Sequence, residues 1–410
     1  MNDSSRLSQT GKPKGPEARD TPEVQSGRQK KALPLAWHPG DLQRAARRRL
    51  PRAIFDYVDG GSYDEVTLRA NRADLEALRL RQRVFCEPGT RKQSTTIAGQ
   101  EARIPVVLGP IGFAGLVRPR GEIHAAKAAQ SFGVPYCLST FSTCSMEEVR
   151  AAVDAPFFFQ LYLFKDDAVN KALLERAEVV GCRTLVLTLD TPVQGRRNRD
   201  LDNGLVVPLR VRLKLALQII AKPWWGIGYG RSHRTIGNLA MFAPRGAELA
   251  EISVWAERNH RGPLTKDDVA WVRKNWPHRL ILKGILDAED ALTAIDLGAD
   301  GVVVSNHGGR QLDGALSTAR AFPAIQEAVG GRTELIFDGG VRSGLDVLKA
   351  LALGAKGCLV GRAYLYGLAA HGQAGVEAAL QLMSQELDSA MAFTCVSDVA
   401  AVKREVLIGG

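Results

Sequence analysis

Short apolar runs recur along most of the chain, and a stretch with helical spacing follows each of them. Eight runs are rich in Val, Ile, Leu and Phe but are too short for helices: 104–109 (IPVVLG), 134–139 (VPYCLS), 157–162 (FFFQLY), 184–189 (TLVLTL), 280–283 (LILK), 301–305 (GVVVS), 335–338 (LIFD) and 357–361 (GCLVG). Continuously apolar strands that alternate with helices are typical of a parallel sheet buried on both faces. Eight such units predict an α/β fold, a (β/α)8 TIM barrel. A doubly wound open sheet is the alternative.

The regions outside this pattern predict the domain boundaries. Residues 1–36 are rich in Ser, Gly, Pro, Gln and charge, which predicts a disordered polar tail. An N-terminal helical segment is expected from Asp41, with interruptions at Pro51 and at Gly60–Gly61. The barrel domain is expected at 37–400, with a long inserted loop at about 198–265 after the fourth strand and a C-terminal tail at 401–410.

The insertion mixes basic, aliphatic and aromatic residues. Arg210, Arg212, Lys214 and Lys222 alternate with Leu, Val and Ile, next to two Trp at 224–225. This composition is typical of a segment that lies at a membrane interface; a loop packed on the barrel or on a neighbouring subunit is the alternative. Because no apolar run reaches about 18 residues and the N-terminus lacks an apolar core, neither a transmembrane helix nor a signal peptide is expected.

Charge and cysteine content add little to the choice of function. The net charge of +10 is compatible with an anionic partner, although basic soluble enzymes are common. A nucleic-acid-binding scaffold would leave the strand-end residues below unexplained, so no nucleic acid is expected. The six cysteines form no C-x-x-C pair, so no metal site is expected. Several lie in apolar runs, which indicates buried, reduced thiols and a cytoplasmic setting.

Two glycine-rich turns follow the seventh and eighth runs, at 337–344 (FDGGVRSG) and 360–367 (VGRAYLYG). Catalytic residues of a (β/α)8 barrel lie just after the strands, and phosphate sites are common after the last two. Exposed glycine N–H groups together with Arg342 and Arg362 suit a phosphate. The turns therefore predict a phosphate site, and tight turns with surface arginines are the alternative.

Polar side chains also end the middle strands. Lys283 lies inside the expected barrel mouth, where an unpaired charge is unfavourable. Its partner is either an anionic ligand, such as a reduced flavin, or a carboxylate in a buried ion pair. Ser139, Gln160 and Thr188 end the second, third and fourth runs and supply hydrogen-bonding groups suited to the rim of a planar ring.

The sixth run leads into SNHGGRQLDG at 305–314, which places a His and an Arg on one short loop. His307 is suited to accept a proton near neutral pH, and Asp190 after the fourth run is the best counter-charge for its imidazolium. Four further side chains complete the expected centre. The guanidinium groups of Arg310 and Arg197 match a carboxylate. The hydroxyls of Tyr57 and Tyr162 can form hydrogen bonds with a substrate oxygen.

These motifs resemble those of the FMN-dependent L-2-hydroxy acid dehydrogenase/oxidase family, in order from about Leu50 to Gly375. The SNHGGRQ segment at 305–311 matches the family's active-site signature. The resemblance implies that His307 is the base and that Asp190 supports it. It also implies two pairs of substrate-contacting residues: Arg310 and Arg197 for the carboxylate, and Tyr57 and Tyr162.

The resemblance further implies FMN as the cofactor and a set of residues that hold it. Lys283 corresponds to the lysine at flavin N1 and O2. The residues implied around the flavin ring are Pro110, Ile111, Gly112, Ser139, Gln160, Thr188 and Ser305. Those implied for the ribityl chain and phosphate are Asp338, Gly340, Arg342, Gly361 and Arg362.

The segment from Lys283 to Ile325 is similar to that of bacterial respiratory L-lactate dehydrogenases. This implies oxidation of an L-2-hydroxy acid, L-lactate above others, to the 2-oxo acid, with electrons passed to a quinone or another respiratory acceptor. An oxygen-using oxidase that makes hydrogen peroxide and an (S)-mandelate-type dehydrogenase are the alternatives. Pro110-Ile111-Gly112 and Phe141 depart from the residues of some oxidases. A homotetramer, cytoplasmic or peripheral on the inner face of the membrane, is also implied.

Overall fold

Eight parallel strands form the centre of the fold in the computed structural model, which describes residues 36, 38–86, 89–205, 213–230 and 235–408. They are β4 (Val106–Leu108), β5 (Cys137–Ser139), β6 (Phe158–Leu161), β7 (Thr184–Thr188), β8 (Arg279–Ile285), β9 (Gly301–Ser305), β10 (Glu334–Asp338) and β11 (Gly357–Val360). Their order is β4-β11-β10-β9-β8-β7-β6-β5, and a parallel bridge between Leu108 and Tyr136 brings β4 beside β5. The predicted (β/α)8 barrel is confirmed, and the open sheet is wrong.

One cluster of buried side chains fills the interior of the barrel. Each strand contributes one residue to it: Val107, Cys137, Phe158, Val186, Ile281, Val303, Ile336 and Leu359. Ile97, Ala98 and Ala102 complete the cluster from an antiparallel hairpin of β2 (Thr95–Ile97) and β3 (Gln100–Ala102). Because the Ala98 N–H donates to Glu334 at the start of β10 (2.8 Å), this hairpin closes the amino-terminal end of the barrel. The flanking strand residues face the helices, as expected for alternating side chains.

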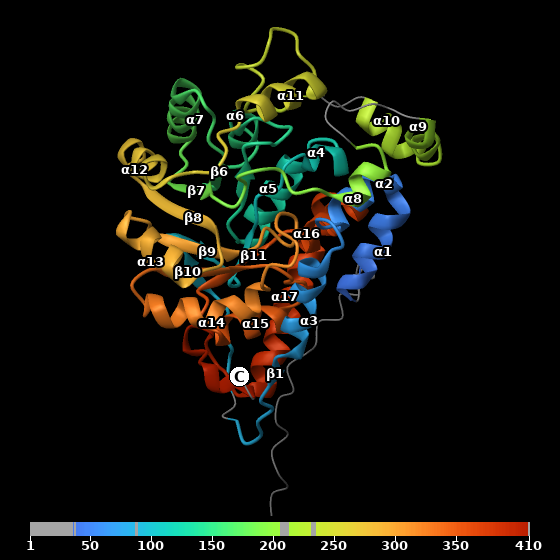
Figure 1. Ribbon diagram of the computed structural model, residues 1–410. Helices are drawn as coiled ribbons and strands as arrows, with labels where there is room; N and C mark the ends of the chain where they lie inside the picture. The colour runs from blue at the N-terminus through green and yellow to red at the C-terminus, as the bar shows by residue number, and fades with distance from the viewer. Residues whose placement is uncertain (1–35, 37, 87–88, 206–212, 231–234, 409–410) are drawn as a thin grey trace, which may run out of the picture. The chain divides into compact units, whose positions relative to one another are not determined.

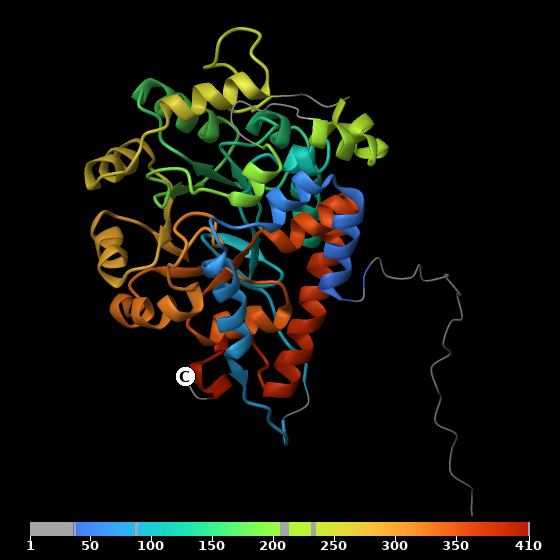
Figure 2. The ribbon, with the colours of Figure 1, turned by 45° about the vertical axis from the view of Figure 1, so that its right-hand side comes forward.

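Helices surround the strands, as Figures 1 and 2 show. Those that follow the barrel strands are α4 (Ala114–Val117), α5 (Gly121–Phe132), α6 (Met146–Arg150), α7 (Asp167–Val179), α12 (Lys266–Asn275), α13 (Ala288–Asp296), α14 (Thr318–Val329), α15 (Gly344–Ala352) and α16 (Arg362–His371). Capping boxes with Ser145, Thr265 and Ser343 at the N-cap fix where α6, α12 and α15 begin. The insertion after β7 contains α8 (Asn198–Asp202), α9 (Leu213–Ile220), α10 (Pro223–Gly230) and α11 (Leu249–Asn259).

The two ends of the described chain pack together beside the barrel. The predicted N-terminal helical segment consists of α1 (Pro39–Arg49), α2 (Arg52–Asp59) and α3 (Val66–Ala77), and the chain ends with α17 (Gln373–Thr394) and the 3-10 turns η1 (Val399–Ala401) and η2 (Arg404–Val406). β12 (Leu407–Ile408) pairs antiparallel with β1 (Arg79–Leu80). Described residues of the predicted C-terminal tail are thus part of the fold, whereas the predicted tail at 1–36 lies outside the described residues except for Ala36.

The expectation of reduced thiols is wrong for two of the six cysteines. Cys86 and Cys395 form a disulfide, with their Cα atoms 5.2 Å apart. The bond joins the segment after β1 to the residue that follows α17. Cys137, Cys144, Cys182 and Cys358 are free and buried, as their apolar surroundings predict. No sequence motif indicates this pair, because 309 positions separate its members.

Removal of this disulfide is expected to destabilise the protein without affecting catalysis. A bond across a long loop restricts the unfolded chain, so the Cys86→Ser/Cys395→Ser variant is expected to lose about 2–4 kcal/mol of unfolding free energy. Urea unfolding of the variant beside the parent protein, each with and without reductant, measures this difference. Reductant should destabilise only the parent. Six reactive thiols in the denatured, unreduced parent protein would show that the bond is not formed.

Candidate active site

Three polar side chains on neighbouring strand ends form a buried hydrogen-bonded chain. Ser139 at the end of β5 donates from Oγ to Oε1 of Gln160 on β6 (3.1 Å), and Gln160 donates from Nε2 to Oγ1 of Thr188 on β7 (3.0 Å). All three are buried, and β5 and β6 pair with Ser139 opposite Gln160. The parallel register therefore sets the predicted ring-contacting groups side by side.

A second polar chain continues across the next three strands. Lys283 on β8 is only 4% exposed; its Nζ donates to Oγ of Ser305 on β9 (3.1 Å) and lies 3.4 Å from Oδ2 of Asp338 on β10. Ser305 in turn donates to Asp338 (2.6 Å). The buried ion pair considered for Lys283 is thus present. Its carboxylate belongs to Asp338, itself one of the residues expected along the ribityl chain.

His307 and Asp190 form the one His–carboxylate contact among the predicted site residues. His307 Nδ1 lies 3.0 Å from Oδ1 of Asp190. Burial lowers the pKa of His307 below its ordinary value, and Lys283 adds to this effect while Asp190 opposes it. Burial alone would raise the pKa of Asp190, but His307 and Lys283 stabilise its carboxylate and hold the pKa below the ordinary value. An ionised Asp190 keeps the proton of a neutral His307 on Nδ1, so Nε2 is free to accept another.

Backbone geometry makes room for this pair. His307 has a positive φ of 58°, a sparsely populated conformation that re-aims its side chain. Gly284 lies at a register irregularity between β8 and β9, and a Cβ there would lie 2.5 Å from Cγ of Asp190. On the same loop, a Cβ on Gly309 would lie 2.6 Å from the backbone N of Leu68. Gly284 therefore makes room for Asp190, and Gly309 lets the His307 loop pack against Leu68.

Two arginines lie beside this pair. Nη1 of Arg310 donates to the carbonyl oxygens of Tyr57 (2.7 Å) and Gly60 (2.9 Å), and its guanidinium lies over the Tyr57 ring at 5.0 Å. Burial and the positive Arg197 lower the pKa of Arg310 to about 9. Nε of Arg197 and Oδ2 of Asp190 are buried and have no hydrogen-bond partner within the described part of the chain. Arg197 also lies 3.8 Å from Oδ2 of Asp200 through its Nη1. Two crowded cations, one of them with an unused buried donor at Nε, are suited to a carboxylate ligand.

Turns after β10 and β11 bring a second pair of guanidinium groups together. Nη1 and Nη2 of Arg362 donate to the carbonyl oxygens of Gly308 (3.0 Å) and Gly60 (2.7 Å), while its buried Nε has no partner among the described residues. Burial and the charge of Arg342 lower the pKa of Arg362 to about 10. Gly340 has a positive φ of 81°. Adjacent cations and a glycine-rich turn fit a phosphate group.

The loop after β4 covers one side of the strand ends. The Tyr57 hydroxyl donates to the Gly112 carbonyl (3.2 Å), and Phe113 N donates to the Phe141 carbonyl (2.9 Å). Ile111 lies against Gly361, where a Cβ would be 3.6 Å from Ile111 Cδ1. Pro110 is partly buried in the same loop. The structure thus brings the predicted 110–112 loop next to the turn after β11.

A row of aromatic rings forms a wall beside the two arginines. Consecutive rings have centroids 5.4–6.5 Å apart, in the order Tyr57, Phe113, Phe141, Tyr162 and His260. Burial raises the pKa of the Tyr162 hydroxyl, which keeps it protonated as a donor. The sequence patterns did not indicate Phe113 or His260 as part of the site. His260 reaches Tyr162 because it is bridged antiparallel to Phe164 at the end of the insertion, and no local motif signals that pairing.

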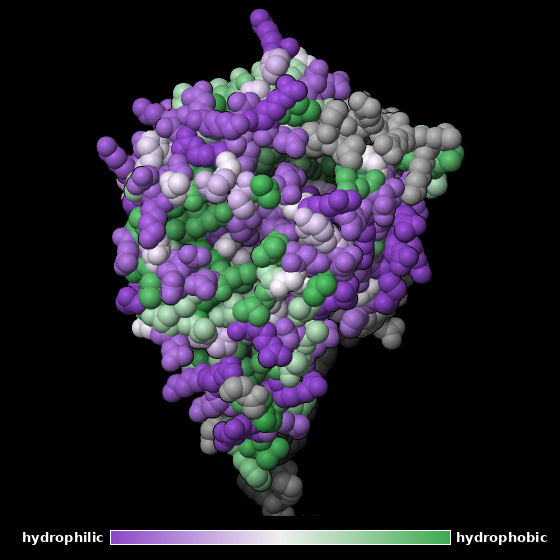
Figure 3. All heavy atoms as spheres, in the orientation of Figure 1, coloured by the Kyte–Doolittle hydropathy of each residue, from purple (hydrophilic) through white to green (hydrophobic). Residues whose placement is uncertain are grey.

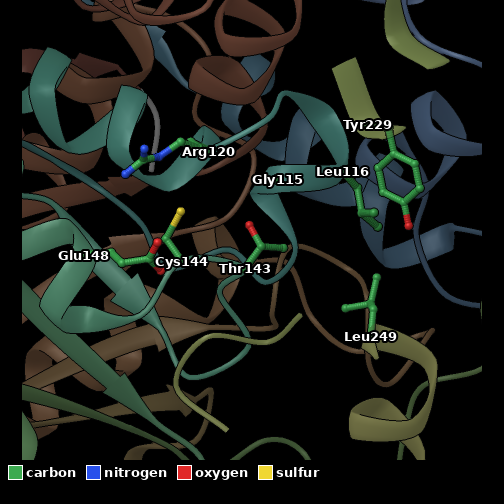
Figure 4. Close-up of a pocket in the computed structure, with 8 residues that line it drawn as sticks. All are labelled: Gly115, Leu116, Arg120, Thr143, Cys144, Glu148, Tyr229 and Leu249. Carbon is green, nitrogen blue, oxygen red and sulfur yellow. The ribbon is translucent and has the colours of Figure 1, made fainter. Parts of the chain in front are cut away.

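A cavity lies beside this region (Figure 4), and none of the predicted site residues lines it. Arg120, Cys144 and Glu148 lie on one side of it and Tyr229 and Leu249 on the other. Its volume of about 20 Å³ holds roughly one water molecule. It is therefore too small to be the binding site for a hydroxy acid or a flavin.

Comparison with known proteins agrees with the fold and identifies the family. The family model of FMN-dependent dehydrogenases matches residues 46–408. An L-lactate dehydrogenase of Caulobacter vibrioides is 48% identical over 369 residues, which are 90% of this chain and 96% of that protein. An L-lactate dehydrogenase of Pectobacterium atrosepticum is 43% identical over the same shares of the two chains.

Solved structures show the same architecture. The monotopic membrane protein (S)-mandelate dehydrogenase superimposes with a TM-score of 0.88 at 33% identity, covering 92% of this chain and all of that one. A mandelate oxidase with (S)-4-hydroxymandelic acid gives 0.78 at 38% identity, covering 90% and 97%. The chain belongs to the FMN-dependent dehydrogenase family. It is accordingly an FMN-dependent oxidoreductase.

Proposed function

We propose that the protein oxidises an L-2-hydroxy acid, L-lactate above others, to the 2-oxo acid. The observation that carries this proposal is the His307–Asp190 contact beside two arginines, Arg310 and Arg197. A base beside two cations, one with an unused Nε, matches a small hydroxylated carboxylate. The curated relatives at 43–48% identity are L-lactate dehydrogenases, which favours lactate over the (S)-mandelate-type alternative.

In this proposal each residue has a distinct task. Arg310 and Arg197 hold the substrate carboxylate in a bidentate fork. Tyr162 donates a hydrogen bond to a substrate oxygen. Tyr57 does the same by turning its hydroxyl proton from the Gly112 carbonyl to the substrate. Burial raises the pKa of both hydroxyls and so keeps them protonated. His307 accepts the substrate proton at Nε2. Asp190 then stabilises the imidazolium through the 3.0 Å contact at Nδ1.

The residues at the strand ends fit FMN. Ser139, Gln160 and Thr188 offer a polar edge for the ring, and Lys283 supplies a buried cation beside it. Arg342, Arg362 and the turns at Gly340 and Gly361 supply the phosphate site. When bound, FMN supplies the two-electron acceptor that oxidation of an alcohol requires.

A substrate panel under anaerobic conditions tests this function. The purified protein is expected to be yellow, and L-lactate is expected to bleach its flavin faster than (S)-mandelate or glycolate, with D-lactate as the inactive control. A colourless preparation that also fails to bind added FMN would overturn the proposal. Faster bleaching by (S)-mandelate would replace L-lactate as the substrate but leave the class of reaction intact.

We further propose a quinone, rather than oxygen, as the electron acceptor. Gly112 and Phe141 differ from the residues of some oxidases, and the curated relatives are named dehydrogenases. Steady-state turnover with a soluble quinone analogue should far exceed turnover in air. Full turnover with oxygen alone, with stoichiometric hydrogen peroxide, would instead establish the oxidase alternative.

We also propose that α9 and α10 contact a membrane surface. Leu217, Ile220 and Trp224 expose 57%, 72% and 86% of their surface. The helices are held to the rest of the fold by Gln218, whose Oε1 accepts from Ala53 N (2.8 Å), and by Trp225, whose indole donates to the Leu116 carbonyl (2.7 Å). Among the described helices none is long and apolar enough to cross a bilayer. The basic positions 210 and 212 lie outside the described residues.

Loss of the exposed apolar side chains is expected to weaken membrane binding. Two large side chains that leave water contribute roughly 1.5–3 kcal/mol each when fully buried, so Ile220→Ser/Trp224→Ser should lower partition onto neutral vesicles at least tenfold. Val179→Ser/Phe393→Ser removes two large apolar side chains that are 86% and 64% exposed elsewhere and should leave partition unchanged. Equal binding by both variants would dismiss α9–α10 as the membrane contact.

We also propose that the protein is a homotetramer. Leu312 and Leu316, on the loop after β9, and Val66 on α3 are exposed, and this loop bonds to α3 through Thr67. Figure 3 shows apolar side chains gathered in patches on an otherwise polar face. Such patches suit a subunit contact. Light scattering of the detergent-free protein should give four times the chain mass; a monomer would contradict the proposal.

A further inference from the structure

Four basic side chains from separate parts of the chain gather beside the end of α16. Arg49 ends α1 and donates to the carbonyl oxygen of Ala370, the residue before His371. Arg118 follows α4 and lies against Gly372, where a Cβ would be 2.8 Å from its Nε. His124 lies on the first turn of α5 and is influenced by Arg118. We call Arg49, Arg118, His124 and His371 the basic cluster.

The basic cluster is electrostatically unbalanced. Burial lowers the pKa of Arg118, His124 and His371. Neighbouring charges lower these pKa values further, and all of those charges are positive. Within the described residues, no carboxylate forms an ion pair with a residue of the basic cluster. Glu122, next to this region in the chain, is buried and its carboxylate accepts from Thr143. The two arginines, held together without a counter-ion, favour binding of an anion, and a bound anion in turn favours protonation of the two histidines.

The basic cluster adjoins the apolar surface of α9 and α10. Lys222, between these helices, donates from Nζ to the Arg48 carbonyl (2.5 Å), directly before Arg49. On α10, a Cβ on Gly228 would lie 3.2 Å from Cγ of Pro119, directly after Arg118. Figures 1 and 2 both show α1, α9 and α10 on the same side of the barrel. Cations thus border the exposed Leu217, Ile220 and Trp224 side chains.

We propose that the basic cluster binds the phosphate of an anionic phospholipid headgroup when α9–α10 lies in the membrane. This inference rests on the proposed membrane contact. A lipid phosphate, rather than a soluble one, is the ligand because the cations lie directly beside the exposed apolar side chains. That arrangement matches a headgroup with its acyl chains. The enzyme therefore prefers an anionic bilayer to a neutral one.

Vesicle sedimentation of the FMN-loaded enzyme tests the headgroup site. Vesicles of phosphatidylcholine alone are compared with vesicles that contain phosphatidylglycerol, at one salt concentration. The parent protein should bind the anionic vesicles more tightly, and Arg49→Gln/Arg118→Gln should lose about tenfold or more of that preference while it keeps its affinity for neutral vesicles. Arg69→Gln/Arg332→Gln removes the same charge from exposed positions elsewhere and should keep the preference.

The controls separate this inference from the membrane contact itself. Equal affinity of the parent for both vesicle types, or equal loss in both double variants, would overturn the headgroup site. Inorganic phosphate is added at millimolar concentration and constant ionic strength. If it abolishes the preference for anionic vesicles, the cluster is a site for soluble phosphate, and the headgroup site is overturned. Weaker binding to neutral vesicles is expected instead for the Ile220→Ser/Trp224→Ser variant. Because a substitution at Arg118 can disturb folding, Arg49→Gln and His371→Gln are measured singly and should each lose part of the preference.

Discussion

Replacing His307 with Gln is expected to leave FMN bound but to slow flavin reduction by substrate by about 10²–10⁴-fold. Gln preserves a polar side chain beside Asp190, so the site keeps its shape, yet it cannot accept a proton. Anaerobic stopped-flow bleaching measures the rate, and the flavin absorbance of the purified variant measures cofactor content. The cause of the loss is then proton acceptance rather than cofactor binding.

His278 provides a matched control, because it also pairs with a carboxylate, Glu178, at 3.0 Å but directly precedes β8, at the opposite end of the barrel from the site. His278→Gln should reduce its flavin at the parent rate. Rapid bleaching in His307→Gln would remove His307 from the mechanism. Loss of flavin from that variant would show that His307 supports the cofactor site instead.

The pH dependence of reduction follows from the same residue. Burial lowers the pKa of His307 below the ordinary value of 6.5, so the neutral, proton-accepting form predominates at pH 7. As the pH falls through the lowered pKa, the imidazole becomes protonated and the base is lost. The acid limb of kcat/KM should therefore lie below pH 6.5. An acid limb well above pH 7 would contradict an uncharged resting His307.

Replacing Arg310 with Lys is expected to lower kcat/KM by about 10–10²-fold, since hydrogen bonds to charged groups contribute roughly 1.5–3 kcal/mol each. Lys retains the positive charge but not the planar fork that binds a carboxylate at two points. In the parent protein, the carbonyl oxygens of Tyr57 and Gly60 accept hydrogen bonds from Nη1 of Arg310. In the variant they would share one flexible ammonium group. Steady-state rates with a saturating acceptor measure the effect.

Arg196→Lys is the control, because Arg196 is exposed and lies next to Arg197 in the chain; its kcat/KM should equal that of the parent. The amide of the hydroxy acid is a neutral substrate analogue. Arg310→Lys should lower kcat/KM for this amide by a smaller factor than it does for the acid. If both substrates lose the same factor, Arg310 acts on the fold of the loop and not on the carboxylate.

The sequence by itself determined the barrel and most of the polar residues at its mouth. The eight strands were predictable because a parallel strand covered on both faces must be apolar along its whole length. The strand-end residues followed, since the carboxyl ends of parallel strands meet at one edge. The position of Lys283 or Gln160 after an apolar run was therefore enough to place it there.

Only the tertiary structure decided which groups meet when they lie far apart in the chain. The Cys86–Cys395 bond, the hairpin that closes the barrel at Ala98, the contact of His260 with Tyr162 and the gathering of Arg49 with Arg118 have no local signature. Periodicity reports which face of an element is buried, but not which distant element covers it. The insertion shows the difference most clearly: its composition indicated a surface role, whereas the folded chain sets α10 beside Pro119 and brings His260 back against Tyr162.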